Sequence, residues 1–170
     1  MPQQDSITIR PVRSDEYETA GELIVEAYRT LDDVPLGDYE ERLRDIATRV
    51  AAGEVLVAEM GGRLVGSVTY IDGLNPLSEG NDPDAGSIRM LGVATNARGQ
   101  GAGEALVVAC IDRAVKSGRR RVRLSTRRSM KSAQRIYERL GFRRDAQYDR
   151  SPAPGINLLG YVLDLDGTRR

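Results

Sequence analysis

The chain has 170 residues, of which 40% are hydrophobic, and 25 Lys and Arg balance 25 Asp and Glu, so it carries no net charge at pH 7. This length predicts a single domain over residues 1–170, large enough to bury its own core without disulfides. The charge balance gives no support for a nucleic-acid or membrane-surface partner. Because the sequence contains no histidine, it excludes a histidine-based catalytic triad and predicts no metal site.

Neither a targeting segment nor a membrane span is predicted. The first twenty residues lack an apolar signal region, and apolar runs of about 18 residues do not occur. We therefore expect a soluble, cytoplasmic protein. The one cysteine, Cys110, falls inside a predicted apolar helix, which is typical of a small core residue in a reducing compartment.

The first part of the chain predicts helices placed among antiparallel strands. Alternating apolar residues that stop at Pro11 indicate an edge strand, Asp38 is a candidate cap for the second helix, and Gly61-Gly62 fits a type I′ hairpin turn. The predicted elements are a strand over 7–12, helices over 14–29 and 38–53 with a break at 31–37, and hairpin strands over 54–60 and 63–71.

The stretch 72–86 lacks periodicity and predicts a long loop, of a length that is usually functional or disordered. After it we expect a strand over 87–94, a helix that ends before Gly118, a strand over 121–126, a helix from 129 or 130 to Gly141, and closing strands over 142–148 and 156–165. The strand–helix–strand run predicts a right-handed crossover between parallel strands. The expected class is therefore α/β (α+β), with a mixed sheet of six or seven strands and four flanking helices.

A glycine-rich turn, Arg98-Gly99-Gln100-Gly101-Ala102-Gly103, joins a predicted strand to a predicted helix. Glycines let a ligand approach the backbone, and the start of a helix favours an anion. The dinucleotide pattern G-x-G-x-x-G/A fails when it is read from Gly99 or from Gly101, and the P-loop pattern fails when it is read from Gly99. The turn instead fits [Q/R]-x-x-G-x-[G/A].

Three stretches together resemble the GCN5-related N-acetyltransferase (GNAT) superfamily. They are Arg-Met-Leu-Gly-Val at 89–93, the turn at 98–103, and Ala-Gln-Arg-Ile-Tyr-Glu-Arg-Leu-Gly-Phe at 133–142. The resemblance is specific over 87–145 and rests elsewhere on the order of the elements. It implies a GNAT-like acyl-CoA N-acyltransferase fold.

The resemblance also implies that acetyl-CoA (coenzyme A) lies across a splay between the strands over 87–94 and 121–126. Its pyrophosphate would lie on the amides of residues 99–104, with Arg98 as a nearby cation or, alternatively, as a solvated loop arginine. Leu91 and Val93 would bind the pantetheine arm and the acyl carbonyl through their backbone. The expected cofactor-binding residues are Leu91, Gly92, Val93, Arg98, Gly99, Gln100, Gly101, Ala102, Gly103, Glu104, Thr126, Met130 and Ala133.

Tyr137 is the candidate catalytic residue, because the family places a tyrosine here that protonates the thiolate of coenzyme A. Periodicity alone favours the alternative that Tyr137 is a core residue, and the resemblance reverses that preference. Many family members carry asparagine where this chain has Met130, and methionine cannot make the asparagine's hydrogen bond to the cofactor.

The general base is not evident from the sequence. Histone-type members carry a glutamate at the position of Ser87. Three acids of the preceding loop, Glu79, Asp82 and Asp84, could act through water, or could simply be solvated charges. Ser87 and Arg89 are candidate acceptor-binding residues, and Arg89 alternatively forms a structural salt bridge.

The arginine run over 119–128 favours solvated strand ends over nucleic-acid binding, with one or two arginines available to the 3′-phosphate of the cofactor. The sequence as a whole predicts an acetyl-CoA-dependent N-acetyltransferase that acts on a small-molecule or peptide amine, without a covalent enzyme intermediate. The alternative is a non-catalytic acyl-CoA sensor of the same fold. Either function is compatible with a homodimer.

Overall fold

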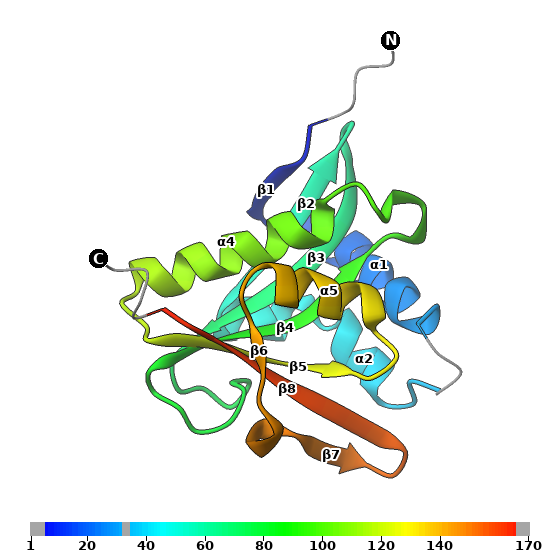
Figure 1. Cartoon of the computed structure of the whole chain (residues 1–170). Helices are drawn as coiled ribbons and strands as arrows, with labels where there is room; N and C mark the ends of the chain where they lie inside the picture. Colours follow the sequence, from blue (N-terminus) through cyan, green and yellow to red (C-terminus); the bar gives the residue numbers. More distant parts are fainter. Residues whose placement is uncertain (1–5, 32–34, 166–170) are drawn as a thin grey trace. The chain divides into compact units, whose positions relative to one another are not determined.

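The computed structural model describes residues 6–31 and 35–165, so part of the predicted break at 31–37 lies outside the described residues. The strands of this part form an eight-stranded sheet in the order β1-β2-β3-β4-β5-β8-β6, with β7 paired to β8 (Figure 1). The chain divides into two compact units, one reaching to Thr69 and including Met90–Ala109, the other comprising Tyr70–Arg89 and Cys110 onward. We call them the first and the second unit.

The strands of the first unit follow the predicted hairpin closely. They are β1 (Thr8–Pro11), β2 (Glu54–Met60), most of β3 (Arg63–Asp72) and the end of β4 (Ala85–Val93). β1 pairs antiparallel with β2, with Thr8 opposite Glu59. Gly61 and Gly62 have φ angles of +56° and +78°, as the predicted type I′ turn requires.

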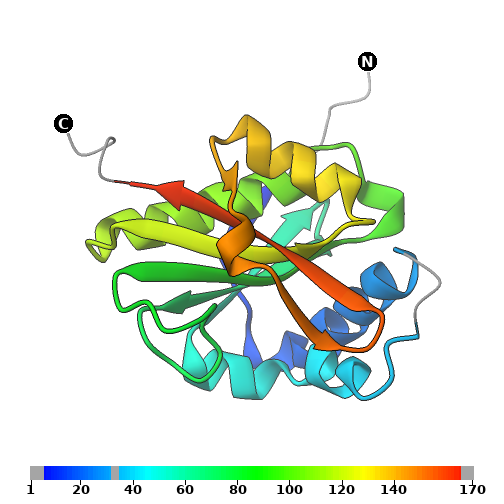
Figure 2. The same ribbon diagram turned by 60° about the horizontal axis from the view of Figure 1, so that its bottom comes forward.

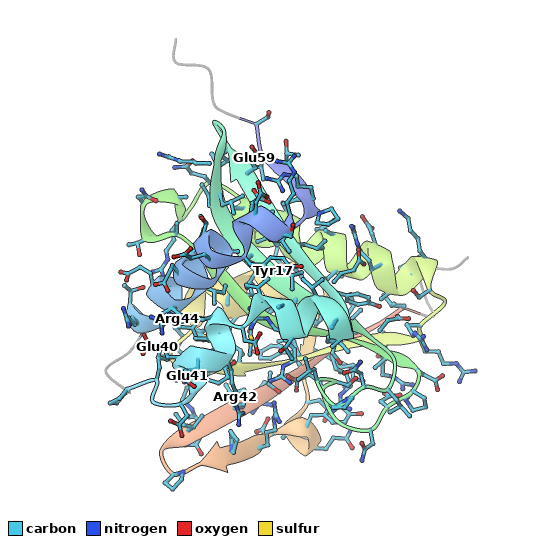
Figure 3. All side chains as sticks on the ribbon, turned by 180° about the vertical axis from the view of Figure 1, so that it is seen from behind. Tyr17, Glu40, Glu41, Arg42, Arg44 and Glu59 are labelled. Atoms are coloured by element: carbon cyan, nitrogen blue, oxygen red, sulfur yellow. The ribbon has the colours of Figure 1, made fainter. Side chains whose placement is uncertain are left out.

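The first unit also contains helices, which pack with its strands. They are the 3₁₀ turns η1 (Ser14–Glu16) and η2 (Thr95–Ala97), the helices α1 (Tyr17–Arg29), α2 (Tyr39–Arg44) and α3 (Ile46–Ala52), and the start of α4 (Ala102–Lys116). Ala20 and Ile46 pack with Val55 and Val57 of β2 in one buried cluster. On the outer side, Arg44 donates to Glu22 at 2.7 Å and to Glu40 at 2.9 Å, the latter pair visible in Figure 3.

The predicted single helix over 38–53 is wrong, because the chain forms two helices that meet at Asp45. The apolar spacing runs on without interruption, but the Asp45 carboxylate accepts the Thr48 amide at 3.1 Å and caps α3. The buried Arg49 guanidinium donates to the carbonyls of Arg42 and Leu43, which a continuous helix would use for its own bonds. Asp38, the predicted cap, makes no capping hydrogen bond.

The second unit contains the parallel pair that was predicted. Its elements are the start of β4, the rest of α4, β5 (Arg121–Arg127), α5 (Lys131–Arg139), β6 (Arg143–Arg144), η3 (Ala146–Tyr148), β7 (Arg150–Ala153) and β8 (Ile156–Asp164). β4 and β5 are parallel, and β8 runs antiparallel along the whole of β5. Figure 2 shows α5 on one side of β5 and β8, and the loop over 73–84 on the other.

The predicted strand over 142–148 is also wrong, because only Arg143–Arg144 pairs with β8 and a 3₁₀ turn follows. Asp145 accepts the Gln147 amide at 3.2 Å and thereby turns the chain. The stretch 151–155, which separates the two predicted closing strands, is mostly strand β7, and the reversal occurs at Gly155, where φ is +80°. The class is confirmed, and these splits explain why the described residues hold eight strands and five α-helices.

Replacing the Asp45 cap tests this account of the α2–α3 junction. We expect Asp45→Ala to lower the free energy of unfolding by about 1 kcal/mol in urea denaturation at pH 7. Asp38→Ala, the matched control, should change it by less than about 0.5 kcal/mol. Equal losses in the two variants would contradict the assignment of the cap.

The effect of Asp45→Ala should also depend on pH. Hydrogen bonds from the Thr48 hydroxyl and amide lower the pKa of Asp45 below its ordinary value of 3.8. The stabilisation is therefore fully present above that ordinary value and is lost as the pH falls through the lowered one. The free energies of unfolding of the wild type and of Asp45→Ala, measured in urea at decreasing pH, should therefore converge in acid.

Candidate functional site

The glycine-rich turn of the first unit exposes its backbone at the start of α4. Gly99 and Gly101 have φ angles of +79° and +93°, which L side chains rarely adopt. A Cβ atom at Gly99 would meet nothing within 4 Å, and one at Gly101 would meet only Ile7 Cδ1, at 3.8 Å. These glycines are therefore required by the backbone conformation rather than by crowding. The first helix-type hydrogen bond joins the Ala105 amide to the Gly101 carbonyl at 3.0 Å.

Arg98 fastens this turn to the end of α1. Its guanidinium donates to the Thr30 hydroxyl at 3.0 Å and to the Ala27 carbonyl at 3.4 Å, although the residue is exposed overall. A cation at the C-terminus of a helix interacts favourably with the helix dipole. This contact gives Arg98 a structural role, and its role beside phosphates stays a prediction.

The end of β4 combines close packing with an unusual backbone. A Cβ atom at Gly92 would lie 2.7 Å from Ile24 Cδ1 and 3.0 Å from Ala27 Cβ, so glycine lets α1 pack directly on the strand. Met90 has a φ of +52°, the one positive value at a non-glycine residue in the described ranges. Such strain is concentrated at functional sites. Leu91 and Val93, the predicted acyl-binding residues, follow directly.

The second unit brings together the predicted residues at the end of β5 and on α5. The Thr126 hydroxyl donates to Met130 Sδ at 3.3 Å, and Met130 is the first residue before α5. Gln134, which the sequence analysis did not single out, is buried and donates to the Arg127 and Arg128 carbonyls at 2.9 and 3.2 Å. α5, which also carries Ala133, is thus tied to the last residues of β5.

Tyr137 points its ring into the interior of the second unit. The residue is 4% exposed, and its ring centroid lies 5.7 Å from that of Phe142 and 6.0 Å from that of Tyr161. Burial raises the pKa of the Tyr137 hydroxyl, with smaller contributions from Cys110 and Tyr161. The hydroxyl therefore stays protonated around neutral pH and is able to donate a hydrogen bond.

Of the three acids in the loop over 73–84, Glu79 alone is turned inward. It is 7% exposed, and its carboxylate accepts the Ser125 hydroxyl at 2.8 Å. Its backbone amide donates to Ser87 Oγ at 2.9 Å. Asp82 instead forms an ion pair with Arg121 at 2.6 Å, and Asp84 is exposed. No pattern within the loop distinguishes Glu79 in the sequence.

Arginines surround Glu79 and its neighbour Gly80. Arg89 approaches the Glu79 carboxylate at 3.9 Å and donates to the Leu77 carbonyl at 2.9 Å, and Arg150 approaches the same carboxylate at 3.5 Å. The salt bridge that was one of two hypotheses for Arg89 is therefore formed. The Arg123 guanidinium lies against Gly80, where a Cβ atom would be 2.8 Å from its Nη1, and also lies 3.7 Å from the centre of the Tyr148 ring. These cations hold the loop on β4 and β5.

Within residues 6–31 and 35–165, no group of three or more histidine, cysteine or acidic side chains could hold a metal ion. No helix in that part of the chain is long and apolar enough to cross a membrane.

Comparison with known proteins identifies the family. The family described as Acetyltransferase (GNAT) family matches residues 17–142, and no curated protein matches the chain. A GNAT acetyltransferase from Staphylococcus aureus Mu50 superposes with a TM-score of 0.76 at 19% identity, covering 95% of this chain and 100% of that one. YncA from Salmonella typhimurium, a putative acetyltransferase solved with its cofactor acetyl-CoA, gives 0.71 at 20% identity and 95% coverage of both chains.

A third relative is named for its substrate. The ribosomal-protein-alanine N-acetyltransferase of Brucella melitensis gives a TM-score of 0.71 at 21% identity and covers 93% of this chain and 99% of its own. At these identities the solved structures support the fold alone. The family match, however, spans more than half of the sequence. The chain therefore belongs to the GNAT acetyltransferase family.

Proposed function

We propose that this chain is an N-acetyltransferase that moves an acetyl group from acetyl-CoA directly to an amine. The observation that carries the proposal is the open turn at the start of α4, where Gly99 and Gly101 hold left-handed backbone with no side chain in the way. Amides at a helix start, together with the positive end of the helix dipole, suit a pyrophosphate. The acetyl-CoA bound to the Salmonella relative supports the same ligand.

Each predicted residue has a task in this proposal. The amides of residues 99–104 bind the pyrophosphate, and the backbone of Leu91, Gly92 and Val93 binds the pantetheine arm and the acyl carbonyl. Thr126, Met130 and Ala133 line the path of the arm. Acetyl-CoA supplies an activated thioester, so the protein has only to position the amine, stabilise the oxyanion and assist the departing sulfur.

Tyr137 assists the departure of the coenzyme A sulfur from the thioester. Its pKa lies above the ordinary tyrosine value of about 10, whereas a thiol has a pKa of about 8.5. Complete proton transfer from tyrosine to thiolate is therefore uphill by at least about 2 kcal/mol. Tyr137 acts by donating a hydrogen bond while charge develops on the sulfur, and solvent completes the protonation.

An acyl-CoA sensor is the second candidate. It is favoured by Met130, whose sulfur accepts the Thr126 hydroxyl and which carries no amide for the cofactor. A sensor would bind the cofactor at the same turn but would lack turnover, so the two functions separate in one assay.

That assay incubates the chain with acetyl-CoA and a panel of primary amines, and measures both thiol release and acetylated product by mass spectrometry. We expect amine-dependent thiol release with one acetylated amine per thiol. Coenzyme A at about 100 times its Kd should add about 2.7 kcal/mol to the free energy of unfolding. Stabilisation without product would support the sensor, and the absence of both would contradict acetyl-CoA as the ligand.

Gly101→Ala tests the turn. A side chain at this φ costs about 1 kcal/mol of stability and displaces the neighbouring amides, so we expect the Kd for coenzyme A in calorimetric titration to rise at least tenfold. Gly62→Ala is the matched control, because Gly62 also has a positive φ and an uncrowded Cβ position, with nothing within 4 Å where Gly101 would meet only Ile7 Cδ1 at 3.8 Å. It should lose similar stability without loss of affinity. A similar Kd for both variants would contradict the role of the turn.

Tyr137→Phe tests the hydrogen-bond donor. We expect kcat to fall at least tenfold, which corresponds to about 1.4 kcal/mol and matches a hydrogen bond to a charged group. The Kd for coenzyme A should change less than threefold, and the ring contacts with Phe142 and Tyr161 should preserve stability. Unchanged turnover would remove Tyr137 from the mechanism.

A further inference from the structure

In the second unit, Tyr137 and Glu79 lie on opposite faces of the sheet. Residues directly opposite one another on neighbouring strands point their side chains to the same face. Leu124 pairs with Ile88 on one side and with Tyr161 on the other, and the Tyr161 ring contacts Tyr137. Tyr137 and α5 therefore cover the face of Leu124 (Figure 2).

Glu79 lies on the other face of this sheet. Ser87 pairs with Arg123, and these two alternate with Ile88 and Leu124, so they point away from Tyr137. Arg89 and Ser125 are two residues further along their strands and share that face. Because Glu79 contacts Ser87, Arg89 and Ser125, its carboxylate lies on the face opposite Tyr137.

Glu79 also lies at a particular point along the strands. The pairs between β4 and β5 run from Ala85 with Arg121 to Ile88 with Leu124, and both strands continue beyond them. Arg89 and Ser125, which hold the carboxylate, are the residues that follow the last pair. The carboxylate is thus fixed where the parallel ladder ends.

The contacts of Glu79 orient its carboxylate without covering the whole residue. One oxygen accepts the Ser125 hydroxyl, and the other faces Arg89 and Arg150 at 3.9 and 3.5 Å. Arg89 is itself held by the Leu77 carbonyl. A buried carboxylate fixed in one orientation presents its oxygen atoms to an approaching ammonium group at a defined position, which a solvated loop acid does not.

We propose that Glu79 is the catalytic residue that receives the acceptor amine and takes its proton, on the face of the sheet opposite Tyr137. This assignment rests on the proposed acetyl transfer. The Glu79 carboxylate takes one proton from the ammonium nitrogen. The neutral nitrogen forms a bond to the thioester carbon, and the carbon–sulfur bond breaks. The nitrogen loses its second proton, the sulfur gains one, and one proton in all passes to solvent.

The two-sided arrangement separates proton removal from proton delivery. An alkylamine of pKa about 10.4 is neutral in only about one molecule in a thousand at pH 7, so a base that removes its proton raises the share of amine able to attack. Because Arg89 and Ser125 hold Glu79 on the face opposite Tyr137, the carboxylate can take a proton from the amine while the Tyr137 hydroxyl donates to the sulfur.

The experiment compares wild-type chain with Glu79→Gln on two acceptors at saturating acetyl-CoA. One acceptor is the alkylamine of the panel that gives the fastest thiol release, and the other is hydroxylamine, a weaker base that is mostly in its neutral form at pH 7.5. We expect Glu79→Gln to lower kcat for the alkylamine about 100-fold at pH 7.5. The loss should shrink as the pH rises toward 10, and kcat for hydroxylamine should fall less than threefold.

Asp82→Asn is the matched control, because Asp82 lies in the same loop and pairs with Arg121 rather than with the proposed site. It should change kcat less than threefold for both acceptors. Glu79→Asp guards against misfolding, since it keeps the charge that pairs with Arg89 and Arg150 while withdrawing the carboxylate by one methylene. Glu79→Asp should unfold like the wild type. Its loss of kcat should depend on the acceptor and on pH in the same way as the loss in Glu79→Gln.

The outcomes separate this assignment from the proposed function. If Glu79→Gln lowers kcat equally for both acceptors at every pH, or does not lower it at all, the role of Glu79 is overturned and the proposed acetyl transfer still stands. Failure of the wild-type chain to acetylate any amine would contradict acetyl transfer itself, and the assignment with it.

Discussion

The short parallel ladder between β4 and β5 is the constraint on which the proposed chemistry of the second unit depends. Its four residue pairs place Ser87 with Arg123 and Ile88 with Leu124, and the antiparallel pairing of β5 with β8 adds Tyr161 to the face of Leu124. The hydrogen bond from the Glu79 amide to Ser87 then fixes a long loop on one of these faces. A loop of this length would otherwise be costly to order, and this contact holds Glu79 near the end of the parallel ladder.

Three of the residues with a positive φ lie at positions that the proposed function uses. Gly99 and Gly101 have it in the turn proposed to bind the pyrophosphate, and Met90 has it within β4, where it is a strained conformation for a residue other than glycine. Gly92 also serves packing, because its missing Cβ lets Ile24 and Ala27 of α1 pack on the strand. The same residue type thus serves binding in one place and packing in another, which explains why the glycines of a motif differ in what their substitution should cost.

Local signals were enough to predict the hairpin with its Gly61-Gly62 turn, the parallel crossover and the glycine turn before α4. They failed where side chains compete with the backbone, as at Asp45, whose cap divides a helix with unbroken apolar spacing. They also could not separate Glu79 from Asp82, because the contacts of Glu79 lie 8 and 46 residues away in the chain. In a loop without periodicity, burial is set by such distant partners and leaves no local pattern.

A crystal structure with acetyl-CoA tests the central claim most directly. The account predicts the pyrophosphate on the amides that begin at Gly99 and the thioester sulfur within about 3.5 Å of the Tyr137 hydroxyl. It also predicts that the Glu79 carboxylate keeps its contact with Ser125 on the opposite face of the sheet. A pyrophosphate bound away from the turn, or a sulfur remote from Tyr137, would contradict it.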